Sequence, residues 1–383
     1  MQSVVMGLLA GLVGFASSFA VVLAGFAAMG ASPAQAASGL TVLCALMGGL
    51  GIGLSWRFRM PVSVAWSTPG GALLAASAAP EGGFPAAVGA FLVAAGLVVA
   101  AGLFRPFARA VEAIPRPLAA AMLAGVLLDL CLAPVRAVGG IPWLALPVVG
   151  AWAVMLRLNR LWAVPAAVAV AAAAFLAGPG LPAGLGWSAP SLEFVRPDFH
   201  WGAVVGIALP LFLVTMASQN LPGLAVLRAN GYAAPLGPAL VATGAGSAAG
   251  ALFGGQLVNL AAITAALCAG PEAHPDPARR WVAAVVAGAA YLGFALLAGT
   301  ATAFAAAAPP LLIQAVAGLA LLGALAGALR AALAEEATQV PAVACFLVAA
   351  SGLSVAGIGA AFWGLLAGGA LWWGLGAGRA PPR

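Results

Sequence analysis

The sequence predicts an all-α integral membrane protein of about fourteen transmembrane helices, of which the third and the tenth are broken. Of its 383 residues, 64% are hydrophobic and only 6% are charged, whereas soluble domains carry roughly a quarter of charged residues. Apolar runs of nearly helix-spanning length recur from end to end, and about 20 apolar residues cross the ~30 Å hydrocarbon core of a bilayer. The short alternating segments typical of an outer-membrane barrel are missing from the sequence.

The predicted spans lie between Pro, Gly and Arg residues. In chain order they cover residues 4–28, 38–56, 61–78, 84–104, 116–133, 141–157, 162–179, 200–227, 236–253, 256–270, 280–304, 309–330, 340–356 and 358–377. The first run is too long for the apolar region of a signal peptide and has an uncharged flank, so we expect it to be a true span.

Two segments are predicted as broken helices because Pro and Gly interrupt their apolar runs. Residues 61–78 contain Pro69 and Gly70, and residues 253–270 begin with Phe253 followed by two glycines. The helix that remains in each is too short to cross the membrane alone. Irregular backbone at that depth is tolerated only where protein buries it or where it lines a wet cavity. One such element in each half of the chain is typical of the central binding site of a transporter.

The distribution of arginine predicts that both termini are cytoplasmic. All fifteen basic residues are arginines, and only Arg136 and Arg196 fall in loops that follow odd-numbered spans. The other thirteen follow even-numbered spans, which is the bias expected of cytoplasmic loops. These are Arg57, Arg59, Arg105, Arg109, Arg116, Arg157, Arg160, Arg228, Arg279, Arg280, Arg330, Arg379 and Arg383.

Fourteen spans divide into two sets of seven, and an odd repeat unit makes the second copy enter the membrane from the opposite side. Faint sequence traces agree with this arrangement. The Ser17-Ser18 pair of span 1 aligns with Ser218-Gln219 of span 8 at an offset of 201, and Ser67 aligns with Asn259 at an offset of 192.

The two breaks predict a site for a small carboxylate, between half-helix N-termini that start near Thr68 and Asn259. A half-helix that starts inside the membrane presents unpaired N–H groups and the positive end of its dipole, which together favour an anion. The surrounding side chains are neutral donors and acceptors, whereas a hard cation would require Asp or Glu ligands. The predicted substrate-binding residues are Ser17, Ser18, Phe19, Trp66, Ser67, Thr68, Gly70, Ser218, Gln219, Asn220, Gln256 and Asn259.

The aromatic residues Phe15, Phe19, Trp66 and Phe253 are expected to wall a flat apolar ligand. Small and hydroxyl residues in membrane helices also serve close packing and hydrogen bonds between helices, and that alternative stays open for the serines and threonines. Two adjacent amides deep in span 8 are costly unless they meet a partner.

Three titratable residues are candidates for proton coupling. Asp129 lies near the predicted outer end of span 5, where it either carries a proton or pairs with Arg136. Glu272 and His274 belong to a polar segment directly after the second half-helix, which is either a solvated loop or a route for protons to the site.

Three motifs resemble the benzoate:proton symporter (BenE) family of bacterial inner membranes. They are MPVSVAWSTPGGALLA (60–75), MASQNLPGLAVLRANGY (216–232) and FGGQLVNLAAITAALCAGPEAHPDPARRW (253–281). The resemblance runs through essentially the whole chain. It implies uptake of benzoate or a related aromatic acid driven by the proton gradient. It also implies a fold like that of the uracil:proton symporter, with fourteen spans in two inverted repeats and short strand-like pieces before the two half-helices.

That fold divides into a core domain and a gate domain. By resemblance, residues 1–110 and 199–306 form the core, from spans 1–4 and 8–11. Residues 111–198 and 307–383 form the gate, from spans 5–7 and 12–14. Uracil-type carriers place an acidic residue in span 8, whereas the matching region here is Ala217-Ser218-Gln219-Asn220. The missing acid suits an anionic substrate, since like charges would repel. The proton carrier stays open among Asp129, Glu272 and the substrate's own carboxyl group.

The sequence therefore predicts a secondary active transporter of an aromatic carboxylate with protons, in the bacterial inner membrane. A passive channel or uniporter for small organic anions is the alternative, because half-helices also build pores; no Arg lies beside either break, however. An enzyme is disfavoured, because the two histidines are far apart and hydrolase and phosphate-loop motifs are missing.

No cofactor and no metal ion are expected. The expected partners are the substrate, protons and membrane lipid, without nucleic acid, and a homodimer is one option for the oligomeric state. The four cysteines, at unrelated spacings within apolar runs, are expected to be buried small hydrophobes.

Overall fold

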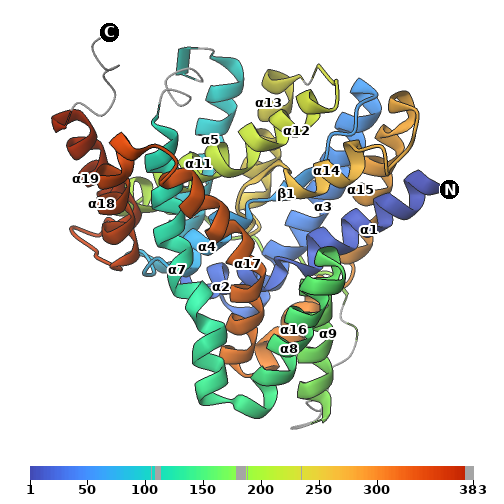
Figure 1. The fold of residues 1–383 in the computed structure, drawn as a ribbon, viewed down its shortest axis with the longest axis horizontal. Helices are drawn as coiled ribbons and strands as arrows, with labels where there is room; N and C mark the ends of the chain where they lie inside the picture. The colour runs from blue at the N-terminus through green and yellow to red at the C-terminus, as the bar shows by residue number, and fades with distance from the viewer. Residues whose placement is uncertain (105, 108–113, 178–186, 188, 234, 376–383) are drawn as a thin grey trace.

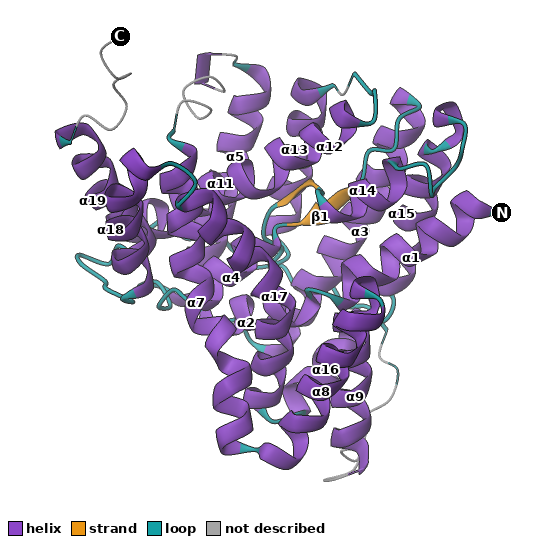
Figure 2. Cartoon of the chain, viewed as in Figure 1, coloured by secondary structure: helices purple, strands orange, loops and turns teal. Residues whose placement is uncertain are grey.

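The computed structural model describes residues 1–104, 106–107, 114–177, 187, 189–233 and 235–375. Within these ranges the chain is almost entirely helical, apart from loops and two short strands near its centre (Figure 2). Four arginines used to predict the orientation, Arg105, Arg109, Arg379 and Arg383, lie outside the described residues. All four cysteines are free and buried, as predicted.

Seven stretches of helix in the described part are long and apolar enough to cross a membrane, and an eighth is bent by 58°. A mostly helical membrane protein is therefore confirmed, whereas the total of fourteen spans stays a prediction. The seven stretches are Gln2–Ala28, Pro33–Phe58, Gly83–Leu103, Arg116–Gly140, Arg160–Ala177, Trp201–Ala229 and Pro310–Ala332.

Each predicted span nevertheless coincides with helical elements (Figure 1). In chain order the longer α-helices are α1 (Gln2–Ala16), α2 (Phe19–Ala28), α3 (Pro33–Phe58), α5 (Gly83–Leu103), α7 (Arg116–Gly140), α8 (Pro142–Leu158), α9 (Ala163–Ala177), α12 (Leu221–Ala229), α13 (Leu236–Ala251), α15 (Trp281–Ala295), α16 (Ala298–Ala307), α17 (Pro310–Ala332), α18 (Gln339–Ala350) and α19 (Ala360–Gly374). The shorter ones are α4 (Thr68–Ala75), α10 (Trp201–Ala203), α11 (Leu209–Thr215) and α14 (Ile263–Ala269).

Both predicted breaks are present, and each begins with a strand. Strand β1 (Val64–Trp66) leads into α4, and strand β2 (Val258–Leu260) leads into α14. The strands pair antiparallel, with Ala65 opposite Asn259. The ladder extends at both ends, because Ser67 N donates to Leu257 O and Ala261 N to Ser63 O, each at 2.9 Å. The two breaks therefore satisfy each other's backbone, which hydrocarbon could not do.

Three further irregularities were not predicted. Span 1 is interrupted at Ser17-Ser18, where α1 ends and α2 begins. Span 8 contains two π-helical turns, η2 (Val204–Ala208) and η3 (Met216–Asn220). Such turns occur frequently at functional sites. The third irregularity is the 58° bend between α15 and α16.

Helices from distant parts of the chain pack in pairs. Helix α3 packs against α15, α5 against α13, and α7 against α17 and α18. The α3–α15 contact depends on Gly48 and Gly288, because a Cβ on either one would lie within 3 Å of the other's carbonyl oxygen. Small residues that let helix backbones approach closely are typical of helix contacts in membranes.

Candidate functional site

The start of α4 is the first component of the candidate site. Ser67 caps the helix, since its Oγ accepts a hydrogen bond from Gly70 N at 3.1 Å. The same hydroxyl lies 2.7 Å from Thr215 Oγ1 at the end of α11, and both side chains are buried. Gly70 packs so tightly against Leu211 that a Cβ there would collide with it. The α4 helix begins at Thr68, where the sequence predicted its start.

The amides of the second break hold the first break in place. Gln256 Nε2 donates to Ser67 O at 3.0 Å. The side-chain amide of Asn259 has one orientation that suits the groups around it. In that orientation its oxygen accepts a hydrogen bond from Ser67 N at 3.0 Å, and its nitrogen donates to Leu260 O at 2.9 Å. Both side chains are completely buried. These residues were predicted to bind substrate; in this conformation they join the two breaks.

A third amide supports β2 from span 8. Asn220 Oδ1 accepts from Leu260 N at 2.9 Å, and Asn220 Nδ2 donates to Met216 Sδ at 3.3 Å. Asn220 is completely buried, so the partner expected for this amide is the strand itself. On the other side of β2, Ser247 of α13 accepts from Val258 N at 2.9 Å.

The second helix, α14, starts later than predicted. The expected start was near Asn259, but that residue lies in β2, and α14 begins at Ile263. No side chain caps this start, and Ile263 is 68% exposed. The cause of the difference is the ladder with β1, which keeps residues 258–260 extended.

An aromatic cluster lies against the interruption of span 1. Trp66 Nε1 donates to Ser18 Oγ at 2.8 Å, which ties β1 to the break between α1 and α2. The ring of Phe15 stacks on Phe19 at 5.3 Å and on Phe294 at 4.5 Å, and lies 5.7 Å from Trp66. Phe294 was not predicted. Phe253, the fourth predicted aromatic residue, instead packs edge-on against Phe194 at 6.2 Å.

The remaining predicted donors, apart from Ser18, are half-buried and therefore partly accessible. Ser17 and Ser18 both donate to Gly14 O, at 3.4 and 3.1 Å, but only Ser18 is buried. Thr68, Ser218 and Gln219 are likewise half-buried. The predicted substrate residues thus separate into a buried, bonded group and a half-buried group.

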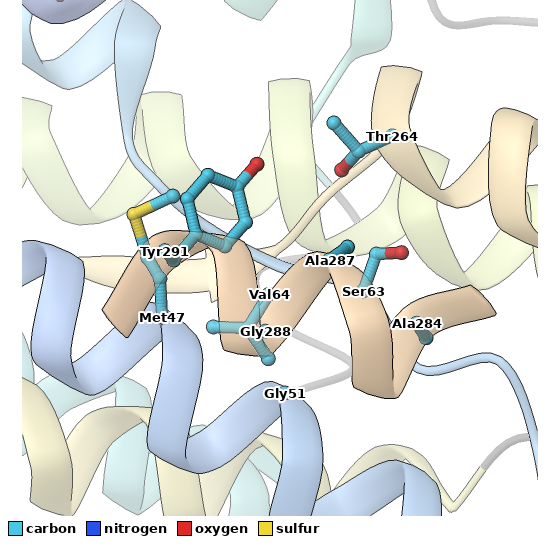
Figure 3. A pocket seen from close by; sticks show the side chains of 9 residues that line it. All are labelled: Met47, Gly51, Ser63, Val64, Thr264, Ala284, Ala287, Gly288 and Tyr291. Atoms are coloured by element: carbon cyan, nitrogen blue, oxygen red, sulfur yellow. The ribbon is translucent and has the colours of Figure 1, made fainter. Parts of the chain in front are cut away.

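Three buried hydroxyls that have no hydrogen-bond partner in the described part of the chain meet at a narrow cleft behind the strands. Ser63 precedes β1, Thr264 lies in the first turn of α14, and Tyr291 comes from α15 (Figure 3). The cleft is too narrow to hold a water molecule. Tyr291 Oη lies directly against Gly14, where any Cβ would collide with it.

The polar loop after α14 contains two of the proton-coupling candidates. Glu272 is exposed, and the half-buried His274 accepts from Asp276 N at 3.0 Å through its Nδ1. The unexpected residue here is Arg280, which is only 8% exposed. Its guanidinium donates to Ala269 O at 2.9 Å and to His274 O at 2.7 Å. A cation at the C-terminus of α14 complements the helix dipole.

Asp129, the third candidate, forms an ion pair with Arg136 at 2.7 Å. Both side chains are more than half exposed. The pairing suggested by their positions in the sequence is therefore present.

Sequence reasoning missed several residues that complete this region. Thr215, Ser247 and Tyr291 are deeply buried. Each belongs to a span other than the two broken ones, and each lies against one of the broken segments. Ser63 and Thr264 were detectable from the sequence, because both are hydroxyl residues within the two predicted broken segments.

Comparisons with known proteins identify relatives over most of the chain. Residues 1–373 match the family model of the benzoate membrane transport protein, BenE. The chain is 42% identical over 365 residues to the inner membrane protein YdcO of Escherichia coli K12, covering 95% of this chain and 93% of that protein. It is 34% identical over 322 residues to a benzoate membrane transport protein of Acinetobacter baylyi, covering 83% and 81% respectively.

Solved structures with a similar fold share little sequence. The transmembrane domain of the cyanobacterial bicarbonate transporter BicA matches with a TM-score of 0.62 and 17% identity, covering 92% of this chain and 97% of that one. SLC26A9 matches with a TM-score of 0.64 and 14% identity, covering 97% of this chain and 65% of that one. The fold predicted by resemblance was that of a uracil symporter, whereas the similarity found lies with BicA and SLC26A9.

Proposed function

This chain belongs to the BenE family of benzoate membrane transport proteins and is a membrane transporter, and from that premise we propose that it takes up benzoate or a related aromatic carboxylate together with protons. The observation that carries the proposal is the paired β1–α4 and β2–α14 arrangement, in which irregular backbone from distant parts of the chain meets inside an apolar helical bundle. Discontinuous helices of this kind form the binding sites of secondary transporters.

The proposed substrate site lies on the accessible side of this arrangement. Ser17, Thr68, Ser218 and Gln219 are half-buried and supply neutral donors toward a carboxylate. Phe15, which stacks on Phe19 and Phe294, supplies an apolar face for a ring. The buried Ser67, Asn220, Gln256 and Asn259 act as positioning residues, because their hydrogen bonds fix the backbone that surrounds the site.

The proposed transport cycle moves a core domain (1–110 and 199–306) against a gate domain (111–198 and 307–383), with seven spans in each inverted half. The packing of α3 on α15 and of α5 on α13 supports the core, and that of α7 on α17 and α18 supports the gate. We place both termini in the cytoplasm on the arginine distribution. The description of YdcO supports a place in the inner membrane.

The test is uptake into proteoliposomes under an imposed pH gradient, acidic outside, with labelled benzoate, substituted benzoates and aliphatic acids. Proton-coupled transport predicts accumulation of aromatic acids above the outside concentration, which an uncoupler collapses. Liposomes without the protein, under the same pH gradient, measure the passive entry of the protonated acid. Equilibration without accumulation would instead support the passive channel or uniporter, and no protein-dependent entry of any aromatic acid would overturn the proposal.

A further inference from the structure

A second cavity, of about 430 Å³, lies away from the two strands. The proposed core lines it with α2, the start of α3, the end of α4 and α16, and the proposed gate lines it with α7 and α17. Helices α2, α4, α7 and α17 lie side by side in this region (Figure 1). The cavity therefore lies between the two proposed domains, and its volume is within the range of roughly 300–1,000 Å³ typical of small-molecule sites.

The cavity wall is apolar apart from a small number of polar groups. Most lining residues are alanines, together with side chains such as Leu23 and Ile313. Among the residues that the structure describes, Asp129 and Arg136 are the only charged ones that line it. A mainly apolar wall with few polar groups matches a ligand that has an apolar body and one charged end.

The guanidinium of Arg136 has unused donor capacity. Its only hydrogen bond among the described residues is the 2.7 Å contact from Nη2 to Asp129 Oδ1. A guanidinium carries five N–H donors, and its planar fork suits a carboxylate bound through two parallel hydrogen bonds. The carboxylate of Asp129 thus uses only one of the N–H donors of Arg136.

Thr302 adds an uncharged polar residue to the cavity wall. This residue of α16 is 5% exposed and lines the cavity, and its hydroxyl has no hydrogen-bond partner among the described residues. The wall beside the ion pair therefore stays mainly apolar, with Arg136 as the only cation that the structure describes there.

We propose that this cavity is a second binding site for a small aromatic monocarboxylate, in which the ligand carboxylate replaces Asp129 on Arg136 and the ring lies against the alanine-lined wall. The inference rests on the proposed function for its ligand class. By the arginine-based topology the site lies on the outer side, so it receives the acid before the central site does. Asp129 competes with the ligand for Arg136.

This competition gives the two members of the ion pair opposite roles. Arg136→Gln should weaken ligand binding by about tenfold or more, since a carboxylate bound to Arg by charge-assisted hydrogen bonds loses its anchor. Asp129→Asn should strengthen binding severalfold, because the competing charge is gone. A purely structural ion pair predicts effects in the same direction for both variants.

The experiment measures protection of a single introduced cysteine. Ala306 is exposed and lines the cavity, whereas Trp143 is 90% exposed and lies outside it. Ala306→Cys and Trp143→Cys are labelled with a maleimide in detergent micelles, with and without benzoate. The native cysteines are buried, and wild-type protein gives the labelling background. Benzamide serves as the uncharged isostere.

Benzoate should slow labelling of Ala306→Cys at least threefold and leave Trp143→Cys unchanged, whereas benzamide should protect neither. Protection should be lost with Arg136→Gln, appear at lower benzoate concentrations with Asp129→Asn, and persist with Asn259→Ala at the central site. Absence of protection at benzoate concentrations that saturate uptake overturns the inference. So does protection that survives Arg136→Gln or that disappears with Asn259→Ala.

The binding assay does not depend on transport. Protection without any uptake in proteoliposomes would reject the proposed function and keep the cavity site. Uptake without protection of the introduced cysteine would keep the proposed function and reject the cavity site.

Discussion

The hydroxyls of Ser67 and Thr215 lie 2.7 Å apart in the buried centre of the molecule. Ser67 also caps α4, so one side chain links the first half-helix to span 8. Replacing Ser67 with Ala removes the cap, which costs about 1 kcal/mol in typical helices. It also leaves the Thr215 hydroxyl buried without a partner, at a further cost of about 1–3 kcal/mol.

Ser67→Ala should therefore lower the melting temperature in detergent by several degrees. The matched control is Ser77→Ala, since the hydroxyl of Ser77, just after α4, donates only to Leu73 O among the described residues. The double variant Ser67→Ala/Thr215→Val should recover part of the loss. Equal melting temperatures for Ser67→Ala and Ser77→Ala would contradict the role assigned to Ser67.

Two consecutive arginines should behave differently. Arg280 is buried and donates to three backbone carbonyls after α14, whereas the side chain of Arg279 is 73% exposed and lies 3.7 Å from Asp276. Arg280→Gln should destabilise the protein by about 3 kcal/mol, the scale of lost hydrogen bonds to a charged group. Arg279→Gln should cost less than about 1 kcal/mol, because surface ion pairs contribute little. Thermal melting monitored by size-exclusion chromatography compares the two, and similar losses would refute the assignment.

Gly14 and Tyr291 should show coupled effects. Gly14→Ala places a methyl group against the Tyr291 hydroxyl, and overpacking of this kind typically costs about 1–3 kcal/mol. Tyr291→Phe removes a buried hydroxyl that has no partner, so it should be neutral or slightly stabilising.

The double variant Gly14→Ala/Tyr291→Phe should then be more stable than Gly14→Ala alone. Gly53→Ala is the control, since nothing lies within 4 Å of the added Cβ there. Additive effects of the two substitutions on the melting temperature would show that Gly14 and Tyr291 are not in conflict.

Asn259→Ala should raise the half-saturation concentration for uptake, by about tenfold if the substrate site loses one hydrogen-bonded support, a cost of about 1.4 kcal/mol. Asn230→Ala is the control, because among the described residues the Asn230 side chain bonds only to Val226 O at the end of α12. Initial-rate uptake in proteoliposomes with matched protein insertion measures both variants. Unchanged kinetics in Asn259→Ala would remove this residue from the site.

Glu272→Gln should abolish proton-driven accumulation if this carboxylate passes protons between the cytoplasm and the site, while substrate exchange across the membrane continues. Glu81, an exposed carboxylate in the loop before α5, provides the control Glu81→Gln. Accumulation and exchange are measured on the same proteoliposomes. Normal accumulation with Glu272→Gln would dismiss the residue as a proton carrier.

Local sequence signals predicted the class of the protein, both breaks and the start of α4. They did so because Pro, Gly and apolar length act within a few residues. The start of α14 was predicted four residues too early. Its position depends on the pairing of Asn259 with Ala65, residues almost two hundred positions apart, which no local pattern reveals.

The sequence predicted which polar side chains lie near the two breaks, but not the groups to which they are hydrogen-bonded. Ser67, Asn220, Gln256 and Asn259 were all identified from their polarity; three lie at the breaks, and Asn220 of span 8 bonds to the second break. Their partners are mostly backbone groups of the two breaks, because extended segments without water must find hydrogen bonds within the protein. The sequence alone could not distinguish a side chain that supports this backbone from one that contacts a ligand.

The β1–β2 ladder also constrains how the molecule is made. Strand β1 is synthesised roughly two hundred residues before its partner, so the ribosome has delivered most of the chain before these backbone groups can pair. Until then the first half of the chain must keep β1 in the membrane with backbone groups that lack their hydrogen-bond partners in β2. A fragment that ends before residue 258 should consequently be degraded when made alone, and should be rescued when the remainder of the chain is supplied as a separate polypeptide.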